Sequence, residues 1–591
     1  MMKRFISALL GSLAAIWISV ILLFVLLILF IAAIISNSFS AQTIALSFKD
    51  KSILHIELNG ELIERPTQPD MMSELYGTAP VTIHLNNIIN SIAAASDDDK
   101  IKGIYIDCKG SIGGLAQRYE ITEALDRFKS SGKWIVAYAD SYTQSDYYIA
   151  SIADELYLNP VGMVDIHGLS ATTMFYKGLL DKAGIEMQII KVGTFKSAVE
   201  PFILTQASEA NRLQQRAFLD NIWDCVGNSI ASAREVTFDN VNYWADSLLM
   251  TFSPDEYLDN NVVDALKYRH DVEALLKTKV GLDSDDDLRL ITPDNYIQIA
   301  DIPHAKRNKN RIAVLYAVGD IVDDGNGGIV ASQLVPQILK LKENDKIGGL
   351  ILRVNSGGGS AFASEQIWEA LEQFKSTDRP FYVSMSDYAA SGGYYISSGA
   401  DVIYAEPVTL TGSIGIFGMI PCVKELMNDK LGVTTDNVST NANGDFPTLM
   451  EPMTPFQRES MQREINRGYE TFVSRCAQGR HVPVDSIKAV AEGRVWDGVS
   501  ALEIGLVDRL GSLTDAIEAM ANQLDYGDDY CVIEYPNPQP TLWEAVSGTE
   551  VKLKDRMLRE SLGESYRIYR SIEQIKHAAP VQCRMEDITI Q

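Results

Sequence analysis

Apolar runs of strand length recur in the same order in two parts of the chain. In each part the second run is followed by glycines and then by a stretch of helical composition. The order strand, glycine turn, helix is typical of an α/β domain with a largely parallel sheet. We therefore predict two α/β domains built on one plan. The runs lie at residues 52–63, 101–108 and 134–140 in the first part and at 311–322, 347–354 and 381–387 in the second.

A direct sequence repeat supports this duplication. Residues 139–168 align without gaps to residues 386–415 at a constant offset of 247, with 11 identities over thirty positions. Unrelated segments of this length would share roughly two. The two halves therefore descend from one ancestral domain, and positions at which they differ become informative.

Two hydroxyls of the second half have no counterpart in the first. Ser391, in DYAASGGYY, aligns with Gln144, and Ser413, in TLTGSIGIFG, aligns with Ile166. Small neighbours would let a carbonyl group approach Ser391, and the N–H of Gly392 would be available at the start of the following helix as an oxyanion donor. Taken alone, however, Ser391 also fits a helix cap, and Ser413 fits an ordinary loop.

A serine nucleophile needs a base, and none of the seven histidines stands in a recognisable position for it. A lysine can act as the base when burial lowers its pKa. Lys196, in GTFKSAVEPF, lies among apolar residues and falls opposite or beside Asn443 of the second half. A lone lysine is more often a solvated surface charge, so only its pairing with Ser391 favours this role. We predict that one half supplies the base and the other the nucleophile, with Ser413 orienting the amine.

The three consecutive glycines 357–359 follow a buried strand and precede a helix expected to begin near Ala361. Such a turn directs free backbone N–H groups at an approaching negative charge, as an oxyanion hole does. A tight turn that only needs positive φ is the alternative. A phosphate cradle is disfavoured because the lysine of the G-x-x-x-x-G-K-[ST] motif is missing.

The N-terminal region contains an uncharged apolar run from Ala14 to Ile35, preceded by Lys3 and Arg4. A helix of this length crosses a bilayer core of roughly 30 Å. The basic flank would stay in the cytoplasm and place the rest of the chain on the other side of the membrane. A cleaved signal peptide is the competing interpretation, but its apolar region is typically about 7–15 residues long. We expect a single-pass anchor.

Composition excludes several classes of function. A chain of 591 residues is too long for one hydrophobic core. Its net charge of −26 argues against a nucleic-acid partner. The six cysteines form no C-x-x-C pair and the histidines no H-E-x-x-H motif, so the sequence predicts neither a bound metal nor another cofactor.

Five motifs together resemble the long form of signal peptide peptidase A, also called protease IV, a family of membrane-anchored serine/lysine peptidases. They are FKSAVEPF (195–202), VNSGGGSAFASE (354–365), AASGGYYIS (389–397), TGSIGIFG (411–418) and GRVWDGVSALEIGLVD (493–508). The resemblance covers nearly all of the chain after the anchor. One departure is Gly357, which replaces a proline common at this turn and removes no N–H donor.

The resemblance implies tandem domains of the crotonase and Clp-protease type. It implies Ser391 as nucleophile, Lys196 as general base, Ser413 as its hydrogen-bonding partner, and Gly392 and Gly359 as backbone oxyanion donors. It further implies cleavage of released signal peptides, a homo-oligomer, specifically a tetramer, and a location in the inner membrane with the catalytic part on the periplasmic side. Whether the dyad forms within one chain or between chains is left open.

Four segments follow from these patterns: a cytoplasmic stub and anchor (1–36), a domain that supplies the lysine (37–305), a domain that supplies the serine (306–535), and a C-terminal helix and tail (536–591). The tail carries no functional signal. Two other functions stay open: an acyl-CoA hydratase or isomerase, which uses the same fold and a similar oxyanion hole, and an inactive membrane scaffold.

Overall fold

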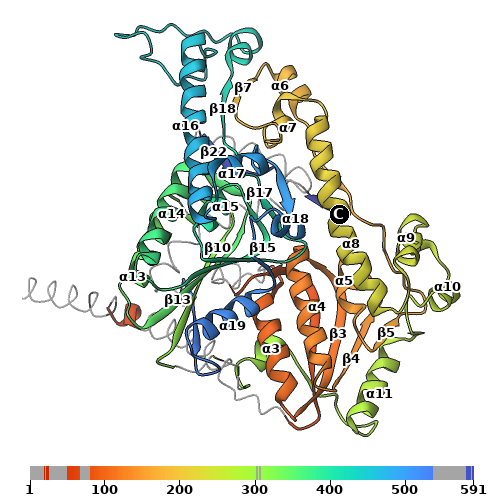
Figure 1. Ribbon diagram of the computed structural model, residues 1–591. Coiled ribbons are helices and arrows are strands. Elements are labelled where there is room, and N and C mark those ends of the chain that lie inside the picture. Colours follow the sequence, from red (N-terminus) through yellow and green to blue (C-terminus); the bar gives the residue numbers. More distant parts are fainter. Residues whose placement is uncertain are drawn as a thin grey trace, which may run out of the picture. The chain divides into compact units, whose positions relative to one another are not determined.

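The computed structural model (Figure 1) describes residues 17, 19, 21–25, 49–66, 80–300, 302, 304, 308–325, 327–536, 581–586 and 589–590. The chain divides into two compact units, residues 1–49 and residues 50–591. Within the described part of the chain, no helix combines the length and the apolarity that crossing a bilayer requires. Most of the predicted span from Ala14 to Ile35 lies outside the described residues.

The first half forms a seven-stranded sheet in which every strand pair is parallel, in the order β2-β1-β3-β4-β5-β8 with β9 beside β1. Its central strands are apolar because both faces of the sheet are covered. The strands are β1 (Ser52–Ile63), β2 (Thr82–His84), β3 (Ile101–Ile112), β4 (Trp134–Ala139), β5 (Glu155–Leu158), β8 (Ala265–Leu266) and β9 (Leu290–Ile291).

The second half forms an eight-stranded sheet, in the order β19-β17-β15-β13-β10-β21, with β16 beside β15 and β20 beside β16. Only the pair β17 and β19 is antiparallel among these strands. The strands are β10 (Arg311–Val318), β13 (Ile347–Ser356), β15 (Phe381–Ala390), β16 (Val402–Ala405), β17 (Leu410–Gly412), β19 (Val495–Asp497), β20 (Arg509–Leu510) and β21 (Cys531–Tyr535).

A third, six-stranded sheet takes strands from both halves, in the order β12-β11-β14-β22-β18-β7. Two further short strands, β6 (Ala171–Thr172) and β23 (Thr589–Ile590), pair with each other. The strands of the third sheet are β7 (Glu186–Lys191), β11 (Ile321–Val322), β12 (Ile329–Val330), β14 (Gly358–Ser360), β18 (Phe417–Cys422) and β22 (Val581–Arg584).

Helices connect and cover these strands, and Figure 1 shows α3 beside α4 in the first half and α13 beside α14 in the second. The first half contains α3 (Leu85–Asp97), α4 (Leu115–Lys129), α5 (Gln144–Ala150), α6 (Lys177–Ala183), α7 (Glu200–Ile203), α8 (Glu209–Ala233), α9 (Phe238–Asp246), η1 (Leu249–Thr251), α10 (Pro254–Asp259), α11 (Arg269–Val280) and α12 (Pro293–Tyr296). The second contains α13 (Ala331–Lys342), α14 (Ala361–Lys375), α15 (Gly392–Ser397), η2 (Leu426–Lys430), α16 (Pro455–Gly479), α17 (Val484–Val490), α18 (Gly498–Glu503) and α19 (Leu513–Gln523).

The internal repeat is visible in these elements. Strands β4 and β15 begin 247 residues apart, as do β5 and β16. The long helices α8 and α16 are both 25 residues long and occupy matching positions in the two halves. The α/β class and the duplication predicted from the sequence are therefore confirmed.

A buried ionic cluster fixes the two halves to each other. Arg353 on β13 is fully buried and forms ion pairs with Glu64, at 2.9 Å, and with Glu120 of the first half. Burial opposes ionisation of Glu64, but the Arg353 guanidinium together with hydrogen bonds from Ser386 and Gln117 outweighs burial and holds the pKa of Glu64 below its usual value. Asp387 of the second half accepts hydrogen bonds from the backbone N–H groups of Ala116, at 2.9 Å, and Gln117, at 3.3 Å. These contacts hold the halves in one register.

Candidate active site

Ser391 stands at the junction between strand β15 and helix α15, which begins at Gly392. Its backbone has φ 56° and ψ −113°, a conformation that costs a non-glycine residue about 1–3 kcal/mol. The Ser391 N–H donates to the carbonyl of Gly412 at 2.7 Å, which helps to hold this sharp turn. The junction places a fully buried hydroxyl at the end of a central strand.

Lys196 follows strand β7 and reaches into the second half. The pairing of β7 with β18, over six residues, carries this part of the first half across to the second. Gly493 has φ +78°, and a Cβ there would lie 2.6 Å from Lys196 Cβ. A Cβ on Gly415 would lie 3.2 Å from Lys196 Cδ. These two glycines leave room for the lysine, whose side chain is almost completely buried.

The structure brings the three predicted side chains together within one chain. Lys196 Nζ lies 2.8 Å from Ser391 Oγ. It also lies 3.0 Å from the carbonyl oxygen of Ser413 and 3.1 Å from Ser413 Oγ. Ser413 Oγ in turn donates to the carbonyl of Gly493 at 3.3 Å. The amine therefore has two oxygens of Ser413 on one side and the Ser391 hydroxyl on the other.

Burial changes the acid–base behaviour of this lysine. Desolvation lowers the pKa of Lys196 from 10.5 to about 7, and the nearby Cys583 thiol acts in the opposite direction. A large share of the amine is consequently neutral near neutral pH. A neutral amine has a lone pair that can accept the proton of a serine hydroxyl.

The glycine turn of the second half and the start of α15 surround one backbone oxygen. A Cβ on Gly358 would lie 2.1 Å from the carbonyl oxygen of Cys583, and a Cβ on Gly392 would lie 3.1 Å from it. Strand β14 places Gly359 opposite Cys583 in the register with β22. A backbone carbonyl oxygen thus lies beside Gly392 and the glycine turn, the two places from which the sequence predicts oxyanion donors.

The matching place in the first half is filled by its own side chains. Gln144 stands where Ser391 would be, and its Oε1 accepts hydrogen bonds from the N–H groups of His167 and Gly168, both at 2.9 Å. Asp146, at the position of Gly393, accepts from the N–H groups of Gly110 at 2.9 Å and Ser111 at 3.2 Å. The N–H groups of this turn therefore bind a carboxylate, and Gln144 has no hydroxyl at the position that aligns with Ser391.

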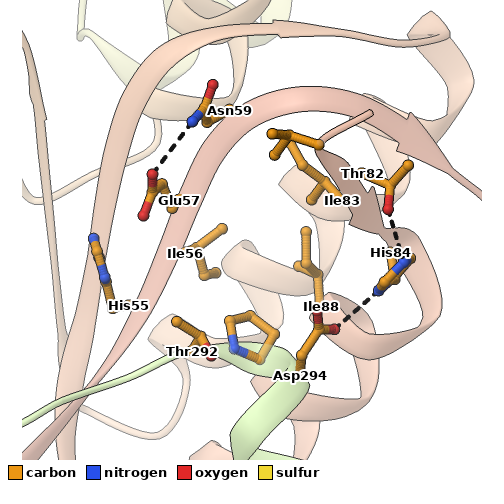
Figure 2. Close-up of a pocket in the computed structure, with 12 residues that line it drawn as sticks. His55, Ile56, Glu57, Asn59, Thr82, Ile83, His84, Ile88, Thr292 and Asp294 are labelled. Carbon is orange, nitrogen blue, oxygen red and sulfur yellow. Dashed lines mark hydrogen bonds and ion pairs between the residues drawn. The ribbon is translucent and has the colours of Figure 1, made fainter. Parts of the chain in front are cut away.

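A pocket of about 230 Å³ lies in the first half beside β1, β2 and α12 (Figure 2). His84 bridges Asp294, at 3.0 Å, and Thr82, at 3.2 Å, on its wall. Its lining contains none of the predicted catalytic side chains. Among the described residues, no group of three or more His, Cys, Asp or Glu side chains is arranged to hold a metal ion.

Sequence reasoning missed three parts of the site. Gly493 and Gly415 pack against Lys196, and both stand inside motifs already quoted, so their positions were visible but their role was not. Strand β22 was missed entirely, because a four-residue stretch in a tail without hydrophobic periodicity gives no signal.

Comparisons with known proteins find one family model and several relatives that match this chain. The model of "Peptidase family S49" matches residues 127–283 and 373–526. "Protease 4" of Haemophilus influenzae is 34% identical over 86% of this chain and 85% of its own length. "Protease 4" of Salmonella typhi is 33% identical over 87% and 84%, respectively. The chloroplastic "Serine protease SPPA" of Arabidopsis thaliana is 28% identical over 91% and 78%.

Among solved structures, a mutant of ClpP1 from Listeria monocytogenes matches 35% of this chain and 95% of its own, with 15% identity and a TM-score of 0.24. A TM-score this low supports no argument about the fold, so the crotonase and Clp-protease type of domain stays a prediction.

Proposed function

The chain belongs to peptidase family S49 and is a serine peptidase, and from this premise we propose that Ser391 is its nucleophile and Lys196 its general base. The observation that carries the proposal is the 2.8 Å distance between Lys196 Nζ and Ser391 Oγ in a buried setting. Membership of a peptidase family sets aside the acyl-CoA hydratase and the inactive scaffold. Each half contributes one of the two reacting groups.

The reaction follows from the protonation state of the amine. The Ser391 hydroxyl gives its proton to the lone pair of Lys196 Nζ while Oγ attacks the peptide carbonyl carbon. The N–H groups of Gly392 and Gly359 stabilise the oxyanion that forms. The Lys196 ammonium then returns the proton to the leaving amine, and an acyl ester remains on Ser391. Water, activated by the same lysine, hydrolyses this ester.

Ser413 orients the base. Its carbonyl oxygen and hydroxyl oxygen can accept the two N–H groups of the neutral amine, at 3.0 and 3.1 Å. With both N–H groups engaged, the lone pair points toward Ser391, which is the task of the third group in a catalytic triad.

The substrates we propose are peptides, in particular signal peptides already released from secreted proteins. A relative from Enterococcus faecium, 33% identical over 39% of this chain, is named "Putative signal peptide peptidase SppA". We further propose that residues 14–35 anchor the enzyme in the inner membrane, with the catalytic part on the periplasmic side, and that it assembles as a homotetramer. The apolar character of that segment supports the anchor.

The test is turnover of a fluorogenic peptide with an apolar residue before the scissile bond, using the full chain in detergent. We expect Ser391→Ala and Lys196→Ala to abolish turnover while circular dichroism shows a folded protein. Ser398→Ala is the matched control, because Ser398 is equally buried and its hydroxyl contacts the backbone carbonyl of Tyr395 and the Cys476 thiol, neither of which belongs to the proposed dyad. Residual activity of either dyad variant above about one thousandth of the wild-type rate would contradict the assignment.

A further inference from the structure

A strand from the end of the chain lies inside the proposed active site. Strand β22 lies between β14, which carries the glycine turn, and β18, and it is antiparallel to both. An extended peptide that adds a strand between two others is a common mode of peptide recognition, in which backbone hydrogen bonds give affinity. Residues 581–584 therefore stand where an extended peptide would bind.

The register of this strand places Cys583 beside the glycines that we propose as oxyanion donors. Cys583 is opposite Gly359, and its carbonyl oxygen lies against Gly358 and Gly392. This is the oxygen that would become the oxyanion if the Cys583 carbonyl were attacked. The Cys583 side chain is fully buried in the main hydrophobic cluster of the second half and interacts with Lys196.

Contacts on the far side of Cys583 hold the segment in place. Arg584 forms an ion pair with Asp320 at 3.3 Å. Glu586 is buried, and its carboxylate accepts a hydrogen bond from Asn211 Nδ2 of the first half at 3.0 Å. The segment thus pairs with strands of the second half and contacts Asn211 of the first, so both halves bind it.

We propose that residues 581–586 occupy the groove that receives peptide substrates, with Cys583 in the place of the residue whose carbonyl is attacked, and that this segment competes with substrates. The proposal rests on the function proposed above and extends it to a built-in ligand. The buried site around Cys583 holds a small, uncharged side chain. We therefore expect substrates to have a small, uncharged residue before the scissile bond.

The first experiment leaves the tail sequence unchanged. In full-length Ser391→Ala, which binds but does not turn over peptides, alkylation of each cysteine by iodoacetamide is followed by peptide mapping. We expect a saturating peptide with alanine before the scissile bond to displace the strand and raise the labelling rate of Cys583 at least about fivefold. Cys476 is the internal control, because it is fully buried in the same cluster and lies on helix α16. An unchanged rate at Cys583 while the peptide is bound overturns the proposal.

The second experiment measures competition. Cys583→Trp places a side chain too large for this buried site, so the strand should leave the groove. If the groove is free in about one molecule in ten of the wild type, the apparent KM falls about tenfold in the variant. Cys583→Ala keeps a small side chain, and we expect it to retain the high KM. A peptide of residues 579–591 added in trans should inhibit Cys583→Trp competitively.

Equal KM and kcat in the wild type and Cys583→Trp would refute competition by the tail. Absence of turnover in every variant would instead refute the proposed function, so the two failures are distinct.

Intact-mass measurement adds a check on the register. Ser391-dependent cleavage between Cys583 and Arg584 would support it, whereas cleavage at another bond of residues 581–586 would overturn it.

Discussion

Replacing Lys196 by methionine should abolish catalysis and stabilise the fold. The lysine is buried, and desolvation lowers its pKa from 10.5 to about 7. Between these two pH values the unfolded chain binds a proton that the folded chain does not. Stability therefore rises with pH across this window, and the lysine weakens the fold most at and below pH 7.

The size of the effect follows from the same two values. The difference between 10.5 and about 7 corresponds to about 5 kcal/mol when both states are protonated. At pH 8 about 3 kcal/mol of this penalty is left, and at pH 10 less than about 1 kcal/mol. Methionine removes the penalty but leaves the hydroxyls of Ser391 and Ser413 without the amine, which costs about 1 kcal/mol. We expect a net gain of about 2 kcal/mol at pH 8 that vanishes near pH 10.

The assay is urea unfolding of the wild type and Lys196→Met at pH 7, 8, 9 and 10, followed by circular dichroism. Lys340→Met, on the exposed face of α13, is the control, for which we expect a change below about 0.5 kcal/mol without a pH trend. A Lys196→Met protein less stable than the wild type at pH 8, or a difference that does not shrink toward pH 10, would refute the reasoning. Either result would mean that the fold does not disfavour the charged amine.

Three further predictions concern the same site and the contact between the halves. The kcat/KM for a peptide should rise about tenfold per pH unit below pH 7 and level off above it, because Lys196 must be neutral to act; a flat profile from pH 5 to pH 9 would contradict this. Ser413→Ala should lower kcat about 10–100-fold and leave KM nearly unchanged, since the hydroxyl orients the amine and does not touch the peptide; an equal rise in KM would argue for a binding role. Arg353→Met should destabilise the protein by about 3–5 kcal/mol in urea unfolding, because it leaves Glu64 and Glu120 buried without a cation, and adding Glu64→Gln should recover part of the loss.

The sequence predicted the central strands well because buried parallel strands have a strong apolar pattern. The runs at 52–63 and 134–140 became β1 and β4, and the helix expected near Ala361 begins there. The helix after Ser391 begins at Gly392, two residues before the expected Tyr394, because glycines do not mark a helix start. The close approach of Lys196 and Ser391 was inferred from complementary losses in the repeat, and their distance could come only from the structure.

Parts of the site that depend on contacts distant in the sequence could not be predicted. Gly493 makes room for Lys196 only because the loop that carries it packs against the first half. Cys583 stands 192 positions after Ser391, and its backbone enters the groove through pairing with β14 and β18. Backbone pairing of this kind depends little on side-chain type, so the amino-acid pattern carries no trace of it.

The burial of Lys196 depends on the contact between the halves, and this makes activity conditional on folding. The pairing of strand β7 with β18 brings Lys196 against the second half, and loops of the second half exclude water from its side chain. If that contact loosened, water would reach the amine, which would then carry a charge at neutral pH and could not accept the serine proton. A damaged or incompletely folded molecule would therefore inactivate itself instead of becoming an unregulated peptidase. The enzyme is therefore active only while its two halves are in contact.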